Sequence, residues 1–268
     1  MSDDENGLAE RHPLTWTFHR NSSRWAHNAL AAGEDALPHP PAEYPEDPFV
    51  RLPPPHLPAA DFADLLRRRF SCRRFADRPL TLPAVSALLH AGYGVLGAAR
   101  LGAMEFLERP VPSAGGLYPL ELYLLARAVE GLAAGVHHYA VIGHGLELRR
   151  EVALPQPLRD YLFMGQSQLT EAPAILLITA VAERCLRKYG DRGYRYILLE
   201  AGHAAQNLNL AAAALGLGSC NIGGFFDLEL GALLRIDPEQ EIALYGIAVG
   251  HPQEGGRERL RGIASEQR

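Results

Sequence analysis

The feature that most constrains this chain is a long apolar stripe between Tyr194 and Leu215. Apolar residues recur there every three or four positions, the spacing that puts side chains on one face of an α-helix. Many of them are alanine, which is small enough to let another helix approach closely. We therefore expect one long helix in the body of the fold, stopped by Gly216 and Gly218.

The rest of the pattern mixes strands with helices. Buried strands are expected at 120–129, 174–183 and 241–250, and a hairpin around Gly143-His144-Gly145. Further helices are expected at 61–70, from Thr81 to Gly92 or Gly94, and near 227–234. Strands interleaved with helices, together with a hairpin, indicate an α+β fold and not a series of βαβ units.

Composition narrows the possible functions. The chain has 268 residues, 47% of them hydrophobic, and a formal net charge of -5. It can bury a core, and it has no basic field to hold nucleic acid or an anionic membrane. No signal peptide or membrane span is expected. The three scattered cysteines favour a cytoplasmic protein without a disulfide framework or a structural metal site.

Residues 1–57 differ from the remainder because their second half is rich in proline. Proline fixes φ and removes a backbone donor, so this half should be extended and irregular. We interpret 1–57 as an arm that wraps over the body or a partner subunit. A partly disordered leader is the alternative. Residues 58–268 are then one compact domain.

Three short segments can bind an anion or a flat ligand. In RRFSCRRF (68–75), Arg69, Ser71 and Arg73 alternate, so an extended backbone would present them together to a phosphate. A solvated basic helix end is the alternative. PSAGGLYP (112–119) permits close approach of a ligand to its backbone, although a plain turn is equally consistent. The glycine-rich stretch 216–227 predicts a loop with exposed amides.

A fourth segment places Lys188 and Tyr189 before a glycine, where either side chain is a candidate proton carrier. A surface lysine beside a packed tyrosine is the alternative. Glu200 and His203 form a Glu-x-x-His pair, which is half of a di-iron motif. No second half exists in the sequence, so we interpret both as polar helix positions that an interface could bury and hydrogen-bond.

These four segments, in this order, resemble the nitroreductase superfamily across about residues 60–252. PSAGGLYPLELYL and the stretch from Lys188 to Asp227 are similar to its azoline-dehydrogenase branch, often called the SagB or ThcOx type. The resemblance implies a nitroreductase-like fold with a central, mainly antiparallel sheet flanked by helices. It also implies an intertwined homodimer with two FMN molecules at the subunit interface.

The resemblance also implies roles for individual residues. Arg69, Ser71 and Arg73 match the family's contacts to the FMN phosphate and ribityl chain. A segment along the flavin ring, donated by the partner subunit in many members, is matched by Pro112, Ser113, Ala114 and Gly115. Gly223 and Gly224 match a loop near the ring. A C-terminal basic residue completes the phosphate site in the family, and the candidates are Arg257, Arg259 and Arg261.

In the azoline dehydrogenases, a Lys-Tyr pair that matches Lys188 and Tyr189 is implicated in catalysis. Turning a thiazoline or oxazoline into an aromatic ring removes a hydride, which FMN accepts, and a proton, which needs a base. Oxygen would reoxidise the flavin. The expected substrate is a heterocyclised peptide or a carrier-bound intermediate, supplied by a cyclodehydratase or an assembly line. The alternatives are an NAD(P)H-dependent nitro or quinone reductase, a flavin oxidase that desaturates another substrate, and a flavin-free scaffold.

Overall fold

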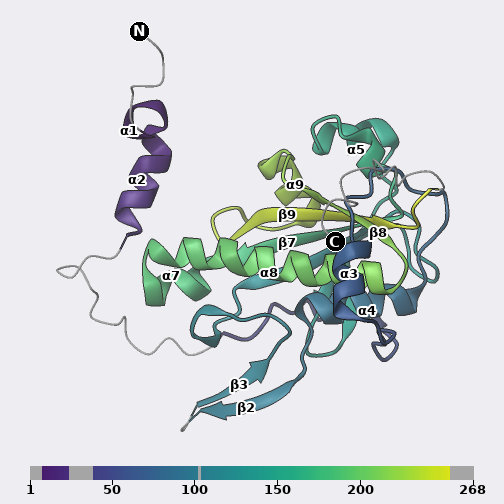
Figure 1. Cartoon of the computed structure of the whole chain (residues 1–268), viewed down its shortest axis with the longest axis horizontal. Coiled ribbons are helices and arrows are strands. Elements are labelled where there is room, and N and C mark those ends of the chain that lie inside the picture. The colour runs from purple at the N-terminus through teal and green to yellow at the C-terminus, as the bar shows by residue number, and fades with distance from the viewer. Residues whose placement is uncertain (1–7, 24–38, 102–103, 254–268) are drawn as a thin grey trace, which may run out of the picture.

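The computed structural model describes residues 8–23, 39–101 and 104–253. Its centre is a seven-stranded sheet with the order β1-β6-β5-β4-β7-β9-β8, and all neighbouring strands are antiparallel. These strands are β1 (Phe49–Arg51), β4 (Leu120–Ala126), β5 (Gly135–Ala140), β6 (Gly145–Glu151), β7 (Ala174–Val181), β8 (Gly218–Ile222) and β9 (Glu241–Gly250). A separate hairpin of β2 (Gly97–Leu101) and β3 (Met104–Glu108) extends from the body (Figure 1).

Helices pack around this sheet, apart from α1 and α2, which stand away from it (Figure 1). They are α1 (Leu8–Arg11), α2 (Pro13–Asn21), α3 (Phe62–Arg68), α4 (Leu82–Tyr93), the 3-10 turn η1 (Ala114–Gly116), α5 (Gln156–Leu162), α6 (Ser167–Thr170), α7 (Glu183–Tyr189), α8 (Arg192–Ala214) and α9 (Asp227–Leu234). Thr81 caps α4, since its hydroxyl accepts the amide of Ala84 at 3.4 Å. None of the helices in the described part of the chain has the length and hydrophobicity that a membrane crossing needs.

The sheet is buried on both faces, which explains why β4 and β7 are apolar along almost their whole length. Alternate residues of β4, such as Leu122 and Leu124, pack in a cluster with α4 and α8. The residues between them, Tyr123 and Leu125, pack in a second cluster with α5 and α9. This layering holds the strand ends, and therefore the turns beyond them, in fixed positions.

Helix α8 lies beside α4 and across the sheet (Figure 1). The two helices approach so closely that a Cβ added to Gly92 would lie 2.6 Å from the side chain of Leu208. The buried residues of α8 are mostly small, as the alanine stripe predicted. The stripe predicted a helix from 194 to 215, and the structure has it at Arg192–Ala214.

The predicted α+β fold with a mainly antiparallel sheet is confirmed. The stretch 216–227 was predicted to be a loop, and this is wrong for Gly218–Ile222, which forms β8 along β9. The hairpin of β2 and β3 and the short helices α5 to α7 were not predicted. The division of the chain at residue 57 stays a prediction.

Part of the predicted arm packs against the sheet. The amide of Ala42 donates to Glu121 at 2.9 Å, and the amide of Tyr44 donates to Glu147 at 3.0 Å. Both carboxylates also hydrogen-bond the fully buried His138, at 3.1 Å and 2.8 Å respectively. The main chain of the arm is thus held by a buried charged cluster.

Candidate active site

Lys188 and Tyr189 meet the turn of PSAGGLYP at Gly115. These two residues end α7, and Gly190, with φ +56°, turns the chain toward α8. Gly115 has φ +64°, and a Cβ built on it would lie 2.6 Å from the Tyr189 hydroxyl and 2.9 Å from Lys188 Nζ. Two segments separated by more than seventy positions in the sequence therefore form one cluster, which we call the Gly115 cluster.

A buried ion pair holds α7 in place. Arg184 donates to Glu121 at 2.6 Å, and both side chains are almost completely buried. Glu121 belongs to β4, which directly follows the Gly115 turn. Lys188 lies one helical turn beyond Arg184 and so on the same side of α7. The ion pair therefore joins the two segments that form the Gly115 cluster.

The two polar groups of the cluster differ in character. Burial, together with the neighbouring Cys185 and Tyr196, raises the pKa of the Tyr189 hydroxyl above its ordinary value. Tyr189 is then a neutral phenol near neutral pH, which disfavours a tyrosinate as the base. Its ring meets that of Tyr196 edge to face at 5.1 Å, and Lys188 Nζ lies 5.6 Å from the Tyr189 ring centre.

Arg69, Ser71 and Arg73 lie on an extended segment beside β8. Ser71 pairs with Ser219, and the amide of Cys72 donates to the Ser219 carbonyl at 2.8 Å. Cys72 is buried between the exposed Ser71 and Arg73, so alternate side chains point outward as predicted. Among the residues that the structure describes, neither Arg69 nor Arg73 pairs with a carboxylate. Their guanidinium groups are thus available to an anion.

Gly223 and Gly224 directly follow β8. The carbonyl of Gly224 accepts from the Gln166 side chain at 3.0 Å, and a Cβ on Gly224 would lie 3.2 Å from the same nitrogen. Asn221, at the end of β8, donates to Tyr245 at 3.0 Å and fixes the strand before the two glycines. Gly223 is exposed, so its backbone is open to a ligand.

The structure does not bring all predicted site residues together within one chain. The Gly115 turn leads into Leu120, which pairs with Ala180 near one end of β7. Ser71 pairs with Ser219, which lies level with Ala174 at the other end of β7. The two positions on β7 are six residues apart, or about 20 Å along the strand. Figure 1 accordingly shows α7 and α3 toward opposite ends of α8.

Glu200 supports the Gly115 turn, a role that the sequence did not predict. It was interpreted as a polar helix position that an interface could bury and hydrogen-bond; within the chain itself it is 2% exposed and accepts a hydrogen bond from the Tyr93 hydroxyl at 2.6 Å. It also hydrogen-bonds Ser113, and burial raises its pKa to about 7. His203, in contrast, is exposed. The sequence did carry a signal for its burial, because Glu200 lies between Ile197 and Ala204 on the apolar face of α8.

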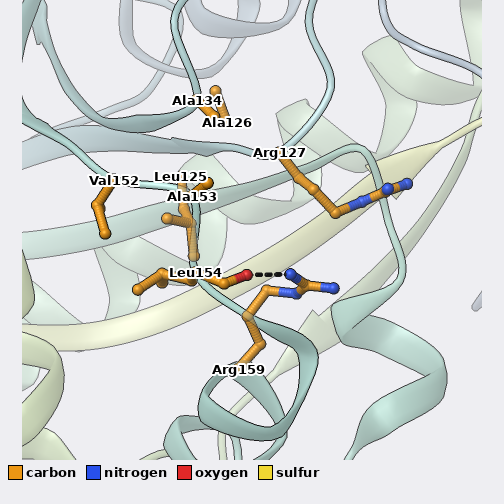
Figure 2. Close-up of a pocket in the computed structure, with 8 residues that line it drawn as sticks. All are labelled: Leu125, Ala126, Arg127, Ala134, Val152, Ala153, Leu154 and Arg159. Atoms are coloured by element: carbon orange, nitrogen blue, oxygen red, sulfur yellow. Dashed lines mark hydrogen bonds between the residues drawn. The ribbon is translucent and has the colours of Figure 1, made fainter.

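A cavity of about 190 Å³ lies at the far end of β4 from the Gly115 turn. Figure 2 shows the residues that line this cavity, among them Arg127 and Arg159. The guanidinium group of Arg159 donates to the Leu154 carbonyl. The cavity lining contains none of the predicted site residues. Because Arg127 and Arg159 are each bonded to backbone carbonyls, we do not assign the cavity to the active site. The candidates Arg257, Arg259 and Arg261 lie outside the described residues.

A model of the nitroreductase family matches residues 66–251. A protein of Methanocaldococcus jannaschii named as nitroreductase MJ1384 is 38% identical over 188 residues, which are 68% of this chain and 88% of that protein. The microcin B17-processing protein McbC of Escherichia coli is 35% identical over 138 residues, 49% of this chain and 50% of McbC.

A solved structure, named as a nitroreductase from Anabaena variabilis, superposes with a TM-score of 0.73 at 26% identity. The superposition covers 92% of this chain and 48% of the Anabaena chain. The chain therefore spans about half the length of this protein and of McbC.

Proposed function

This chain belongs to the nitroreductase family, and on that basis we propose an FMN-dependent dehydrogenase that oxidises thiazoline or oxazoline rings to thiazole or oxazole. Its substrate would be a heterocyclised peptide or a carrier-bound intermediate. Family membership makes the chain an oxidoreductase. The similarity to McbC, a microcin-processing protein, supports the SagB-type branch and a peptide substrate. A cyclodehydratase or an assembly line would supply the ring.

The residues present fit FMN. Arg69 and Arg73, without carboxylate partners among the described residues, and Ser71 between them suit a phosphate and a ribityl chain. Gly223 is exposed at the far end of β8 from Ser219, and a Cβ on Gly116 would meet nothing within 4 Å, so the backbone leaves room for a flat ring at both positions. When bound, FMN would supply the hydride acceptor. Pro112, Ser113, Ala114 and Gly115 stay proposed as ring contacts.

The observation that carries the proposal is the convergence of Lys188 and Tyr189 on Gly115. Loss of a hydride from an azoline must be accompanied by loss of a proton, and an unprotonated lysine amine can accept it. Tyr189, as a neutral phenol, can donate a hydrogen bond to the ring and orient it. Because Gly115 has no side chain, its turn lies directly against both groups, which brings Lys188 and Tyr189 to the proposed ring contacts.

The composition of the chain also supports a role for Lys188 as proton acceptor. Of 26 basic residues, Lys188 is the only lysine, so the other 25 are arginine (26 − 1). An arginine side chain stays protonated in proteins and cannot act as a base near neutral pH, whereas a lysine can. The one lysine of the chain thus stands beside Gly115, where a group able to accept a proton is proposed to act.

The test is Lys188→Arg, which keeps the positive charge and removes the base. We expect FMN binding to stay close to wild type and azoline oxidation to fall about 100-fold or more, the usual contribution of a general base. The reaction is followed by the loss of two hydrogens in the mass of an azoline peptide. Arg187→Lys on the same helix is the matched control and should stay active. An active Lys188→Arg enzyme would remove Lys188 from the role of base.

A second candidate is an NAD(P)H-dependent nitro or quinone reductase, which the name of the Methanocaldococcus relative favours. The two candidates are separated by anaerobic mixing with NADH or NADPH. Rapid loss of the flavin colour would support the reductase, and its absence together with azoline oxidation would support the dehydrogenase.

A further inference from the structure

Glu200 is buried in the middle of α8, where it contacts two hydroxyl groups from distant segments. The Tyr93 hydroxyl, at the end of α4, donates to Glu200 Oε1 at 2.6 Å. The Ser113 hydroxyl, at the start of the Gly115 turn, also hydrogen-bonds this carboxyl group. A buried carboxyl group is costly unless it is well hydrogen-bonded, so these contacts stabilise its position.

Through these hydroxyls, Glu200 reaches both ends of the Gly115 turn. Ser113 Oγ accepts the amide of Tyr118 at 2.9 Å. The Tyr93 hydroxyl accepts the amide of Leu120 at 3.2 Å, where β4 begins. One carboxyl group therefore terminates two hydrogen-bond chains that hold the backbone on either side of Gly115.

The turn between these ends has an unfavourable backbone conformation. Tyr118 has φ +45°, which is uncommon for a residue with a side chain, and Gly115 and Gly116 have φ +64° and +67°. Such a conformation persists only where surrounding contacts hold it. Arg109 adds one such contact, because its guanidinium group stacks on the rings of Tyr93 and Tyr118, 4.4 Å and 4.9 Å from their centres.

We propose that Glu200 is a positioning residue that holds the Gly115 turn against Lys188 and Tyr189 by accepting hydrogen bonds from the hydroxyl groups of Ser113 and Tyr93. That Glu200 holds the turn follows from the hydrogen bonds described above. That this matters for turnover rests on the proposed function of Lys188 and Tyr189.

The ionised form of Glu200 serves this role best. A carboxylate accepts hydrogen bonds from both hydroxyls, whereas a protonated carboxyl group must use one oxygen as a donor and breaks the pattern. Burial raises the pKa of Glu200 to about 7, opposed by the bonds from Ser113 and Tyr93 and by Arg109. The groups that face it also include Tyr118 and the Cys185 thiol of α7. The turn should thus loosen as the pH falls below about 7.

Amide hydrogen exchange of the full chain tests this proposal. At about pH 8, we expect the amides of Tyr118 and Leu120 to be protected about tenfold less, or weaker still, in Glu200→Gln than in wild type. Within the variant, this protection should change little between about pH 6 and pH 8. Wild type should lose protection at both amides over that range. Glu130→Gln, a change at an exposed position, is the matched control and should behave as wild type. Wild-type protection at both amides in Glu200→Gln would overturn the proposal.

Two further variants keep the test decisive if Glu200→Gln folds poorly. Ser113→Ala should lower protection at Tyr118 and leave Leu120 protected, and Tyr93→Phe should do the reverse, because each removes one chain. If both variants lost protection equally at the two amides, the idea of two separate hydrogen-bond chains that end at the Glu200 carboxyl group would be wrong.

With an azoline substrate and saturating FMN, kcat of wild type should fall below about pH 7, and this dependence should be absent in Glu200→Gln. A purely structural role would lower the melting temperature and leave the pH profile in place. If wild type does not oxidise azolines, the proposed function fails, while the exchange results still decide the role of Glu200.

Discussion

At the scale of single residues, Gly115 is the most tightly constrained position of the site. Its φ of +64° lies in the left-handed region, which favours glycine, and a side chain there would meet the Tyr189 hydroxyl and Lys188 Nζ at under 3 Å. The first constraint concerns stability, and the second concerns the position of the proposed proton acceptor.

Gly115→Ala separates these effects. We expect a loss of at least about 1 kcal/mol in the free energy of unfolding, because alanine is strained at positive φ. We expect turnover to fall much more than this loss would explain, because the methyl group displaces Lys188 and Tyr189. Gly131→Ala, also at positive φ but with open space around it, is the control for strain alone. Urea unfolding and turnover measure the two effects, and equal turnover in the two variants would contradict the prediction.

Single residues could be predicted from the sequence only where a local motif marks them. Lys188 and Gly115 each stand in a short distinctive segment. Glu200 and its partner Tyr93 stand 107 positions apart in the sequence. Their contact depends on how α4 packs on α8, and no local pattern in the sequence specifies that packing.

At the scale of elements, the buried cluster of Glu121, His138 and Glu147 ties the arm to β4, β5 and β6. Burial by itself lowers the pKa of His138, but its bonds to Glu121 and Glu147 outweigh burial and raise it. Both ring nitrogens also lie at carboxylate oxygens, 2.8 Å and 3.1 Å away, which favours an imidazolium ion that donates to both carboxylates. Arg184 of α7 shares Glu121. The arm and the helix that carries Lys188 thus depend on one charged cluster.

Because the pKa of His138 is higher in the folded than in the unfolded protein, its protonation stabilises the fold. This stabilisation is complete below the pKa of the unfolded state, about 6.5, and is lost as the pH rises through the pKa of the folded state. We expect the free energy of unfolding of wild type, relative to His138→Gln, to decrease as the pH is raised above about 6.5. Urea unfolding at several pH values measures this difference, in which the contributions of groups that do not contact His138 cancel. A difference that does not vary with pH would contradict the assignment of the imidazolium ion.

Elements could be predicted where one periodicity dominates. The apolar segment 241–250 forms β9 with the predicted bounds, and the alanine stripe forms α8. In contrast, β8 consists of Gly-Ser-Cys-Asn-Ile, which has weak strand propensity. It is a strand because the long strand β9 offers it an edge and Ser71 pairs on its other side. Tertiary pairing of this kind is not visible in a local sequence.

At the scale of the whole molecule, α7, which ends with Lys188 and Tyr189, and α3, which ends just before Arg69, lie toward opposite ends of α8 (Figure 1). The strand positions level with the Gly115 turn and with the Arg69–Arg73 segment are about 20 Å apart on β7. One chain therefore does not bring the Gly115 cluster and this segment into contact with each other. The predicted homodimer would do so if one copy supplies the phosphate segment and the other supplies Gly115, Lys188 and Tyr189.

Mixing two inactive variants tests this arrangement. Arg73→Ala removes a proposed phosphate contact and Lys188→Ala removes the proposed base, so we expect each variant to be inactive as a homodimer. When the two are coexpressed, about half of the dimers contain one of each chain, and each of these has one intact site. We therefore expect about a quarter of wild-type activity. No recovery in purified mixed dimers would show that both clusters act within one chain.

Because Lys188 is the only lysine in the chain, isotope labelling of lysine alone places a single reporter in the Gly115 cluster. Growth with nitrogen-15 lysine would give one side-chain signal in the magnetic resonance spectrum, free of overlap. Its chemical shift distinguishes an ammonium ion from an amine, so the protonation of this one group can be observed directly as substrate is added. A composition dominated by arginine thus makes the proposed proton transfer open to direct spectroscopy.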